Sequence, residues 1–437
     1  MLKKLIPILL LTAFYLPAQS LFDDALQEDL LSSVALNYEL NGYIRGGIYE
    51  GPVPGKSGYE SKDRYGEAAL KLRLRQGQGG DAYSELRFRN TNNSESSTSS
   101  FYIREAYVSA YLGTFDLRIG QQVVQWGKAD GYNPTNIITP LDLLVYSPHE
   151  DDRRTSNFLI RSFYNWSVLR LEAIWVPIYS SSVLPFSKIE LPEGIQLSKP
   201  DYPDKAIKNS AIALKLHYDG ASLDGTLSYF NGFSPMPGLL ARTENSILNI
   251  FPTTYRIQMI GADFSTTLGA YGLRGEFAYR EPNEKDNTRL SIPNNQVEYI
   301  LGLEREFGNF NLIIQYIGKH VFDYENLYKA HQTSPEFATY KIALWNRLLS
   351  GQLKEWSHAL SFRLAWNLCY ETLSLELLGQ INLSTEETFL KPKLSYDLTD
   401  DLILSAGAQI YHGPDNTLFG LLDKNNSAGF IELKASF

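Results

Sequence analysis

Hydrophobic and polar residues alternate along much of this chain, in segments of about ten residues. In the last segment, 427–437, every second residue from Gly429 to Phe437 is small or apolar, whereas Glu432 and Lys434 lie between them. Successive side chains of a β-strand point to opposite faces of a sheet, so this segment would carry one charged and one apolar face. Such a strand suits a wall between water and lipid.

The same alternation recurs upstream, and its connections are short and long in turn. Short Gly-, Asn- and Asp-containing turns alternate with long loops, of which the longest are 125–156, 177–209 and 320–355. Outer-membrane barrels have short periplasmic turns, longer external loops and an even number of strands. Counting hairpins predicts about 18 strands, with 16 as the alternative, and places both ends of the barrel on the periplasmic side.

We therefore predict an all-β fold, a closed antiparallel transmembrane β-barrel over residues 35–437. A soluble β-sandwich would bury its apolar rows, and a β-helix would show a fixed repeat, which this sequence lacks. The stretch Thr339 to Leu353 is better read as a helix within a loop than as a strand.

The N-terminus has the pattern of a secretory signal peptide over residues 1–20. Lys3 and Lys4 precede an apolar run of 12 residues that ends at Leu16, and small residues flank a cleavage point after Ser20. The run is short for a membrane-spanning helix, which needs about 20 residues. Residues 21–34 have helical spacing and predict a short N-terminal helix, either a plug at the periplasmic mouth or a flexible leader.

Composition agrees with an outer-membrane barrel. Aromatic residues make up 13% of the chain, as interfacial girdles would require, and the single cysteine excludes an intrachain disulfide. The net charge of −9 is opposite to that of a typical nucleic-acid binder. The terminal Phe437 resembles the signature that the barrel-assembly machinery recognises. The expected partners are this machinery, outer-membrane lipid and lipopolysaccharide, and small solutes, with no nucleic acid; a homo-oligomer is left open.

Charged residues on the inward faces of the early strands form the candidate lumen surface. A cation facing lipid at the membrane midplane costs about 2–4 kcal/mol, so these side chains are expected to face water or one another. A one-sided basic wall would concentrate anions, whereas a salt-bridged ladder would stiffen the barrel; the sequence leaves both open. The predicted pore-lining residues are Lys71, Arg73, Arg75, Glu85, Arg87, Arg89, Glu105, Arg118, Arg161 and Arg170.

The loop 125–156 breaks the strand pattern. It contains three prolines, yet it is richer in Ile, Leu and Val than a solvated loop should be. Loops of this length are usually functional, so we predict that it folds into the lumen and narrows it; an external lid or a packing plug is the alternative. Its acids would face the basic wall formed by Arg73, Arg87, Arg89 and Arg118. The candidate constriction residues are Trp126, Asp130, Asn133 and Asp142.

A motif lies at the start of this loop. Ile119-Gly120-Gln121-Gln122 is followed by Trp126-Gly127, Asn133-Pro134 and Pro140-Leu141-Asp142. This run of about 25 residues, summarised as WG-x-x-D-x-x-NP, resembles one in little-characterised porin-like outer-membrane barrels, including relatives of the alginate-export type. The resemblance implies a solute-passing barrel and carries over neither a substrate nor catalytic residues.

Enzyme signatures are missing. There is no G-x-S-x-G elbow and no zinc spacing of histidine pairs, and the six histidines fall mostly in predicted loops. Calcium at Glu150-Asp151-Asp152 lacks ordered ligand spacing. We expect a non-enzymatic, cofactor-free porin-like channel in the cell outer membrane for passive diffusion of small hydrophilic solutes, with a preference for anions as the finer expectation. A plugged transporter of hydrophobic substrates and a surface adhesin or structural barrel are the alternatives.

Overall fold

The computed structural model describes residues 36–53, 58–92, 97–184, 195–244, 247–284, 290–327, 329, 331 and 336–437. The predicted signal peptide (1–20) and helical leader (21–34) lie outside the described residues.

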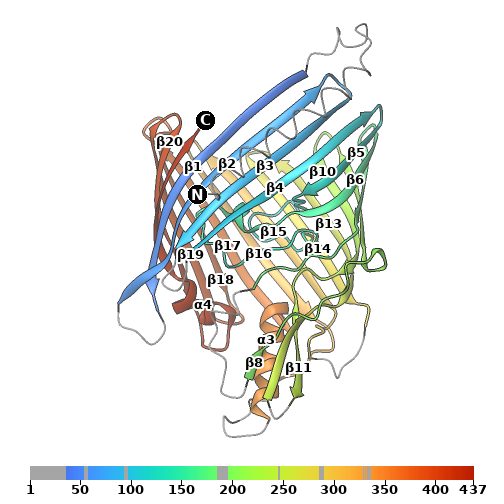
Figure 1. Ribbon diagram of the computed structural model, residues 1–437, viewed down its shortest axis with the longest axis vertical. Coiled ribbons are helices and arrows are strands. Elements are labelled where there is room, and N and C mark those ends of the chain that lie inside the picture. Colours follow the sequence, from blue (N-terminus) through green and yellow to red (C-terminus); the bar gives the residue numbers. More distant parts are fainter. Residues whose placement is uncertain are drawn as a thin grey trace, which may run out of the picture.

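The chain forms one closed barrel of 18 antiparallel strands (Figure 1). Strand β1 pairs with β2 on one side and with β21 on the other, which closes the barrel. Gly42 and Phe437 exchange backbone hydrogen bonds of 2.9 and 3.0 Å at this seam. The predicted fold and the count of 18 are confirmed. The barrel strands are β1 (Leu36–Pro52), β2 (Tyr59–Gln76), β3 (Gly80–Asn92), β4 (Ser97–Leu112), β5 (Phe115–Gln122), β6 (Asn157–Trp166), β7 (Leu169–Val176), β9 (Ala211–Asp219), β10 (Leu223–Phe233), β13 (Arg256–Leu268), β14 (Tyr271–Pro282), β15 (Gln296–Phe307), β16 (Phe310–Val321), β17 (Trp356–Leu368), β18 (Leu373–Asn382), β19 (Glu387–Thr399), β20 (Leu402–His412) and β21 (Ala428–Ser436).

The wall has its apolar side outside and its charged side inside. On β1, Ile44 and Ile48 are 62% and 48% exposed, whereas Arg45 and Tyr49 between them are 3% and 1% exposed. A soluble sandwich would show the reverse, because it would bury its aliphatic rows. Phe430, which breaks the alternation of β21, points inward and stacks on Tyr49 with ring centroids 5.2 Å apart.

The long loops carry secondary structure of their own at one end of the barrel. Strands β8 (Ile195–Leu197), β11 (Gly238–Glu244) and β12 (Ile247–Thr253) form a small sheet, and helix α3 (Phe337–Ser350) packs against it beyond the barrel rim (Figure 1). The helix predicted from Thr339 is confirmed. The sheet was not predicted, because it pairs short segments that are far apart in the sequence.

A second helix, α4 (Leu418–Asn426), lies in the connection between β20 and β21 and was not predicted either. Thr417 caps its N-terminus by accepting a hydrogen bond from the backbone N–H of Gly420. Among the residues that the structure describes, no helix has the length and apolar character needed to cross a membrane.

Candidate functional site

The connection between β5 and β6, residues 123–156, enters the barrel and contacts its inner wall (Figure 1). We call this segment the inner loop. Its first half, 123–139, packs on an apolar patch of the wall, where strands β6 to β14 place hydrophobic rather than charged residues inward. Trp126 is 2% exposed within this cluster. The other buried members are Val124, Ile137, Ile138, Leu159, Ile174, Val176, Ala213, Phe230, Ile257, Met259 and Ala278.

A single carboxylate, that of Glu276 on β14, holds the turn of this half. The backbone N–H groups of Lys128 and Ala129 donate to Oε2 at 3.2 and 3.3 Å. Thr135 donates its backbone N–H and its hydroxyl to Oε1 at 2.7 and 2.8 Å. Gly127 has a φ of +103°, and a Cβ there would lie 2.5 Å from Glu276 Oε2. The close approach of loop and carboxylate therefore requires glycine at this position.

The tip of the first half reaches further round the wall. Asp130 Oδ2 lies 2.7 Å from Arg363 Nε on β17, and the backbone of Asp130 exchanges two hydrogen bonds with the Gln315 amide, at 2.8 and 2.7 Å. The hydroxyl of Tyr132 donates to Glu298 on β15 at 2.9 Å. This part of the loop is thus fixed to β14 through β17.

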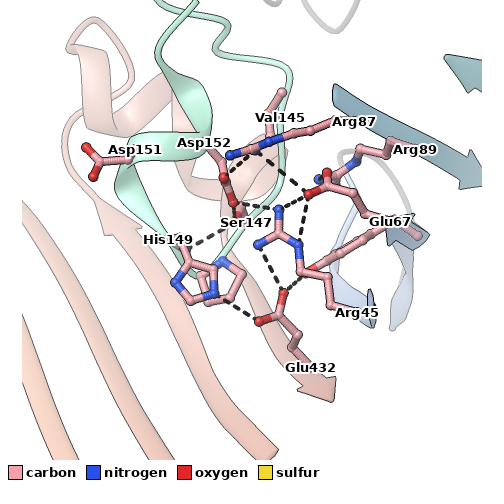
Figure 2. Close-up of polar contacts among 12 residues, drawn as sticks. Arg45, Glu67, Arg87, Arg89, Val145, Ser147, His149, Asp151, Asp152 and Glu432 are labelled. Atoms are coloured by element: carbon pink, nitrogen blue, oxygen red, sulfur yellow. Dashed lines mark hydrogen bonds and ion pairs between the residues drawn. The ribbon is translucent and has the colours of Figure 1, made fainter. Parts of the chain in front are cut away.

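The second half, 140–156, is held by arginines of β1 to β4, which we call the arginine cluster: Arg45, Arg87, Arg89 and Arg104. Asp152 lies 2.8 Å from Arg45 and 2.7 Å from Arg87 (Figure 2). Arg104 donates to the backbone oxygen of Asp151 at 2.7 Å. The loop therefore presents both a carboxylate and a carbonyl to this basic surface.

The arginine cluster is itself neutralised by carboxylates at its base. Glu67, whose side chain is fully buried, lies within 4 Å of Arg45, Arg87 and Arg89 (Figure 2). Arg87 also pairs with Glu85 at 2.7 Å. A buried charge without such partners would be strongly unfavourable, so the cluster is an interlocked network and not a free basic surface.

Two charges hold Asp152 in its ionised form. Burial would raise the pKa of this carboxyl, but Arg45 and Arg87 outweigh burial and hold its pKa well below the usual range. The Ser147 hydroxyl also donates to Asp152. The contact is therefore between full charges at neutral pH.

The end of the loop also contacts the last strands. His149 Nε2 lies 3.1 Å from Glu432 on β21, Lys391 on β19 donates to the Pro148 carbonyl at 2.9 Å, and Arg153 donates to Gln409 on β20 at 3.3 Å. Strands β3 and β15, both contacted, are half a circuit apart in the 18-strand order. The inner loop thus bridges the full width of the lumen.

Two cavities flank the segment 148–152. One, of about 570 Å³, lies toward β1 to β4 and includes Lys71, Arg104 and Lys434 in its lining. The other, of about 250 Å³, lies toward β17 to β19 and includes Arg363, Lys391 and Lys393. His149 and Asp151 line both. Water-filled space therefore lies on either side of this short segment.

The predicted lumen residues are distributed along the inner wall. Arg87 and Arg89 belong to the arginine cluster, and Glu85 pairs with Arg87 and Lys71. Glu105 accepts from the backbone N–H of Val123, at the root of the inner loop. Nearer the short-turn end, Arg73 lies 3.9 Å from Asp81, and Arg75 pairs with Glu39 at 3.0 Å.

Three further arginines continue the wall on β5 to β7. Arg161 pairs with Glu172 at 2.7 Å, and Arg118 bonds to Ser109 at 3.0 Å. Arg170 lies 3.5 Å from His217, whose other ring nitrogen contacts Glu172. Whether these ten residues govern permeation stays a prediction.

The predicted constriction residues do not act as one group. Trp126 packs on the wall, and Asn133 Oδ1 is buried behind the Gly127 turn. Asp142 accepts from the N–H of Leu144, inside the loop. The expectation that the loop acids face one basic wall needs correction: Asp130 meets Arg363 on β17, whereas Asp152 meets β1 and β3. The acids diverge because the loop spans the lumen.

Sequence reasoning missed the residues that hold the loop most closely. Arg45, Glu67, Arg104, Glu276 and Arg363 are all inward residues of barrel strands. Alternation could have placed Arg45 inward, since it lies between Ile44 and Gly46. Nothing local could have shown that Glu276 would accept four donors from a loop about 140 residues earlier.

Comparisons with known proteins show a likeness of fold. No family model matches the chain, and no curated relative matches it in sequence. Among solved structures, Acinetobacter baumannii OccAB4 has a TM-score of 0.54 at 12% identity, covering 92% of this chain and 97% of its own. The outer membrane protein opdK from Pseudomonas aeruginosa has a TM-score of 0.53 at 9% identity (92% and 98%), and Pseudomonas aeruginosa OccK5 (OpdH) 0.52 at 10% (92% and 97%). The chain therefore shares the barrel fold of an outer-membrane protein over nearly its whole length.

Proposed function

We propose that this protein is a porin-like channel of the outer membrane, through which small hydrophilic solutes diffuse past the inner loop with a preference for anions. The barrel fold, its apolar outer surface and its charged inner surface support the channel. The similarity to solved outer-membrane barrels agrees with this location. The resemblance of the 119–142 motif to porin-like barrels points the same way.

The anion preference rests on one observation, the unequal exposure of the two partners in the lumen ion pairs. Side chains of Lys71 and Arg73 are 37% and 36% exposed, whereas their partners Glu85 and Asp81 are 6% and 8% exposed. Across the lumen, Arg280 is 22% exposed and Glu298 only 1%. The carboxylates lie against the wall and the longer cationic side chains extend past them, so a passing solute meets cations first.

The asymmetry has limits at the loop itself. Asp130 and Arg363 are equally exposed at 22%, and Glu150 is more exposed than its partner Arg363. Both signs of charge therefore meet a solute beside the inner loop. We expect a moderate preference for anions and not strict selection.

Charge removal in a planar bilayer tests this proposal. We expect the wild-type channel to give a reversal potential of the anion-selective sign under a tenfold KCl gradient, since chloride meets Lys71 and Arg73 first. Replacing both with Gln should lower the anion-to-cation permeability ratio by roughly twofold. A matched control, Lys205→Gln with Lys208→Gln, removes the same charge from exposed residues of a long loop and should leave the ratio unchanged.

Two results would contradict the proposal at different levels. A correctly folded barrel without conductance would refute the channel and favour a structural or adhesive role. Conductance with cation preference, or with no response to loss of Lys71 and Arg73, would refute the electrostatic part alone. A transporter of hydrophobic substrates is disfavoured by the charged lining of both cavities beside the loop.

A further inference from the structure

Four aromatic rings form a continuous stack on β16 and β17: His320, Trp356, His358 and Tyr316. Ring centroids are 4.1 Å apart for His320 and Trp356, 6.3 Å for Trp356 and His358, and 6.0 Å for His358 and Tyr316. The interplanar angles are 28°, 10° and 22°, so the rings are nearly parallel. We call these four residues the ring stack.

The ring stack lies on the outer face of the barrel. Trp356 shares its face of β17 with Leu360, and these residues are 50% and 39% exposed, whereas Ser361 on the opposite face is buried. On β16, Tyr316 and His320 share a face with the exposed Ile314, and Gln315 points inward to the loop. The rings therefore face the membrane and not the lumen.

Strand length places the stack at the membrane boundary. The opposite ends of the same strands carry an outward aromatic pair, Phe310 and Trp366, with ring centroids 6.3 Å apart. Ten residues separate Phe310 from His320, and ten separate Trp356 from Trp366. Ten strand residues span about 33 Å, which a tilt of about 40° reduces to about 25 Å, the height of the apolar band of such barrels. The ring stack is at the long-loop end, so it lies at the headgroup level of the outer leaflet.

The stack offers more than an ordinary aromatic girdle. His320 Nδ1 is buried with no hydrogen-bond partner among the described residues. His358 Nδ1 lies 2.6 Å from the Tyr316 hydroxyl, which orients the imidazole. Lys354, two residues before Trp356, is exposed. Imidazole and ammonium groups can donate to phosphate, and a half-exposed indole provides a flat surface for the C–H face of a sugar.

We propose that the ring stack binds the phosphorylated sugar headgroup of lipopolysaccharide in the outer leaflet. The phosphate would meet the imidazoles and Lys354, and a headgroup sugar would lie against Trp356. The outer leaflet is the only one that this end of the strands reaches, and a phosphorylated sugar matches both the donors and the flat ring. The inference depends on the barrel's orientation and is independent of solute passage.

Native mass spectrometry of the purified full-length barrel in detergent, with lipid A as the probe, tests this site. The wild-type protein should retain lipid A, and His320→Ala with His358→Ala should weaken retention about tenfold, the size of a lost charge-assisted contact. Lipid A with one phosphate removed should bind the wild type more weakly. His412→Ala is the matched control, because His412 is an exposed histidine at the same end of β20.

The outcomes separate the possibilities. Equal retention by wild type and double variant, or equal retention of lipid A and phosphatidylglycerol, would overturn the proposal and leave a general aromatic girdle. An equal loss in the His412→Ala control would overturn it as well. Each variant must keep the heat-dependent gel shift of a folded barrel. A second variant, Trp356→Leu, should lower retention of lipid A more than that of phosphatidylglycerol if the sugar contact exists, and an equal effect on both lipids would refute it.

Discussion

The two halves of the inner loop are attached to the barrel by different physics. Residues 123–139 bury Trp126 and its apolar neighbours against β6 to β14, and Glu276 accepts four hydrogen bonds from this half. Residues 140–156 are held by charges, above all by Asp152 between Arg45 and Arg87. Apolar burial depends little on salt and pH, whereas ion pairs depend on both. We therefore expect the first half to be a permanent part of the barrel and the second half to be releasable.

Loss of the Trp126 side chain should have the largest effect. Removing a fully buried aromatic side chain leaves a cavity and typically costs about 3–5 kcal/mol. Trp126→Ala should lower the free energy of unfolding by this amount in urea titrations of the barrel in lipid vesicles. Trp166→Ala is the control, because Trp166 is 68% exposed on the outer surface. An equal loss in both variants would show that the first half contributes no special stability.

Glu276→Ala should come next. The substitution leaves the N–H groups of Lys128, Ala129 and Thr135 without their acceptor, a cost of about 2–3 kcal/mol after partial rescue by water. The freed turn should raise single-channel conductance, because its tip no longer holds its place in the lumen. Glu276→Gln keeps one acceptor oxygen and should show a smaller effect. Unchanged conductance in Glu276→Ala would mean that the apolar cluster alone fixes this half.

Asp152→Asn should affect only the second half. The neutral amide loses the charge interaction with Arg45 and Arg87, which remain paired with Glu67, so we expect a loss of about 1–2 kcal/mol. Single-channel traces should show more frequent transitions between conductance levels. Asp151→Asn is the matched control, because that side chain is 73% exposed. If both variants behave like wild type, charge does not hold this half of the loop.

Acidification should reproduce the Asp152 effect in the unmodified protein, with the smallest change. The pKa of Asp152 is depressed in the folded state, so its contribution is fully present above the pKa of an unperturbed aspartate, about 4, and is lost as pH falls below it. Conductance transitions should therefore increase on lowering the pH below about 4, and Asp152→Asn should remove this part of the response. A response that is the same in the variant would place the titrating group elsewhere.

Much of the fold could be predicted because it depends on a local property of each strand. Alternation of Ile44, Arg45 and Gly46, or of Ile431, Glu432 and Leu433, shows which face meets lipid without knowledge of any neighbour. Turn residues give the hairpins, and adjacent hairpins in the sequence are adjacent in the barrel. The strand count follows from the same reasoning.

The candidate site could be predicted only in part. The apolar character of the loop indicated that it would be buried, but not which wall each residue would meet. Asp130 and Asp152 look equivalent in the sequence, yet they bind strands on different sides of the lumen. Their partners are more than 60 residues away in every case, and no local pattern links them.

The sequence by itself determined the membrane wall, because the choice between lipid and water is made one side chain at a time. The tertiary structure alone decided the interior, because the path of the inner loop depends on which carboxylates and arginines the closed barrel brings within reach. Glu276 and the arginine cluster become loop anchors only after the barrel has closed and excluded enough water for their charges to require partners.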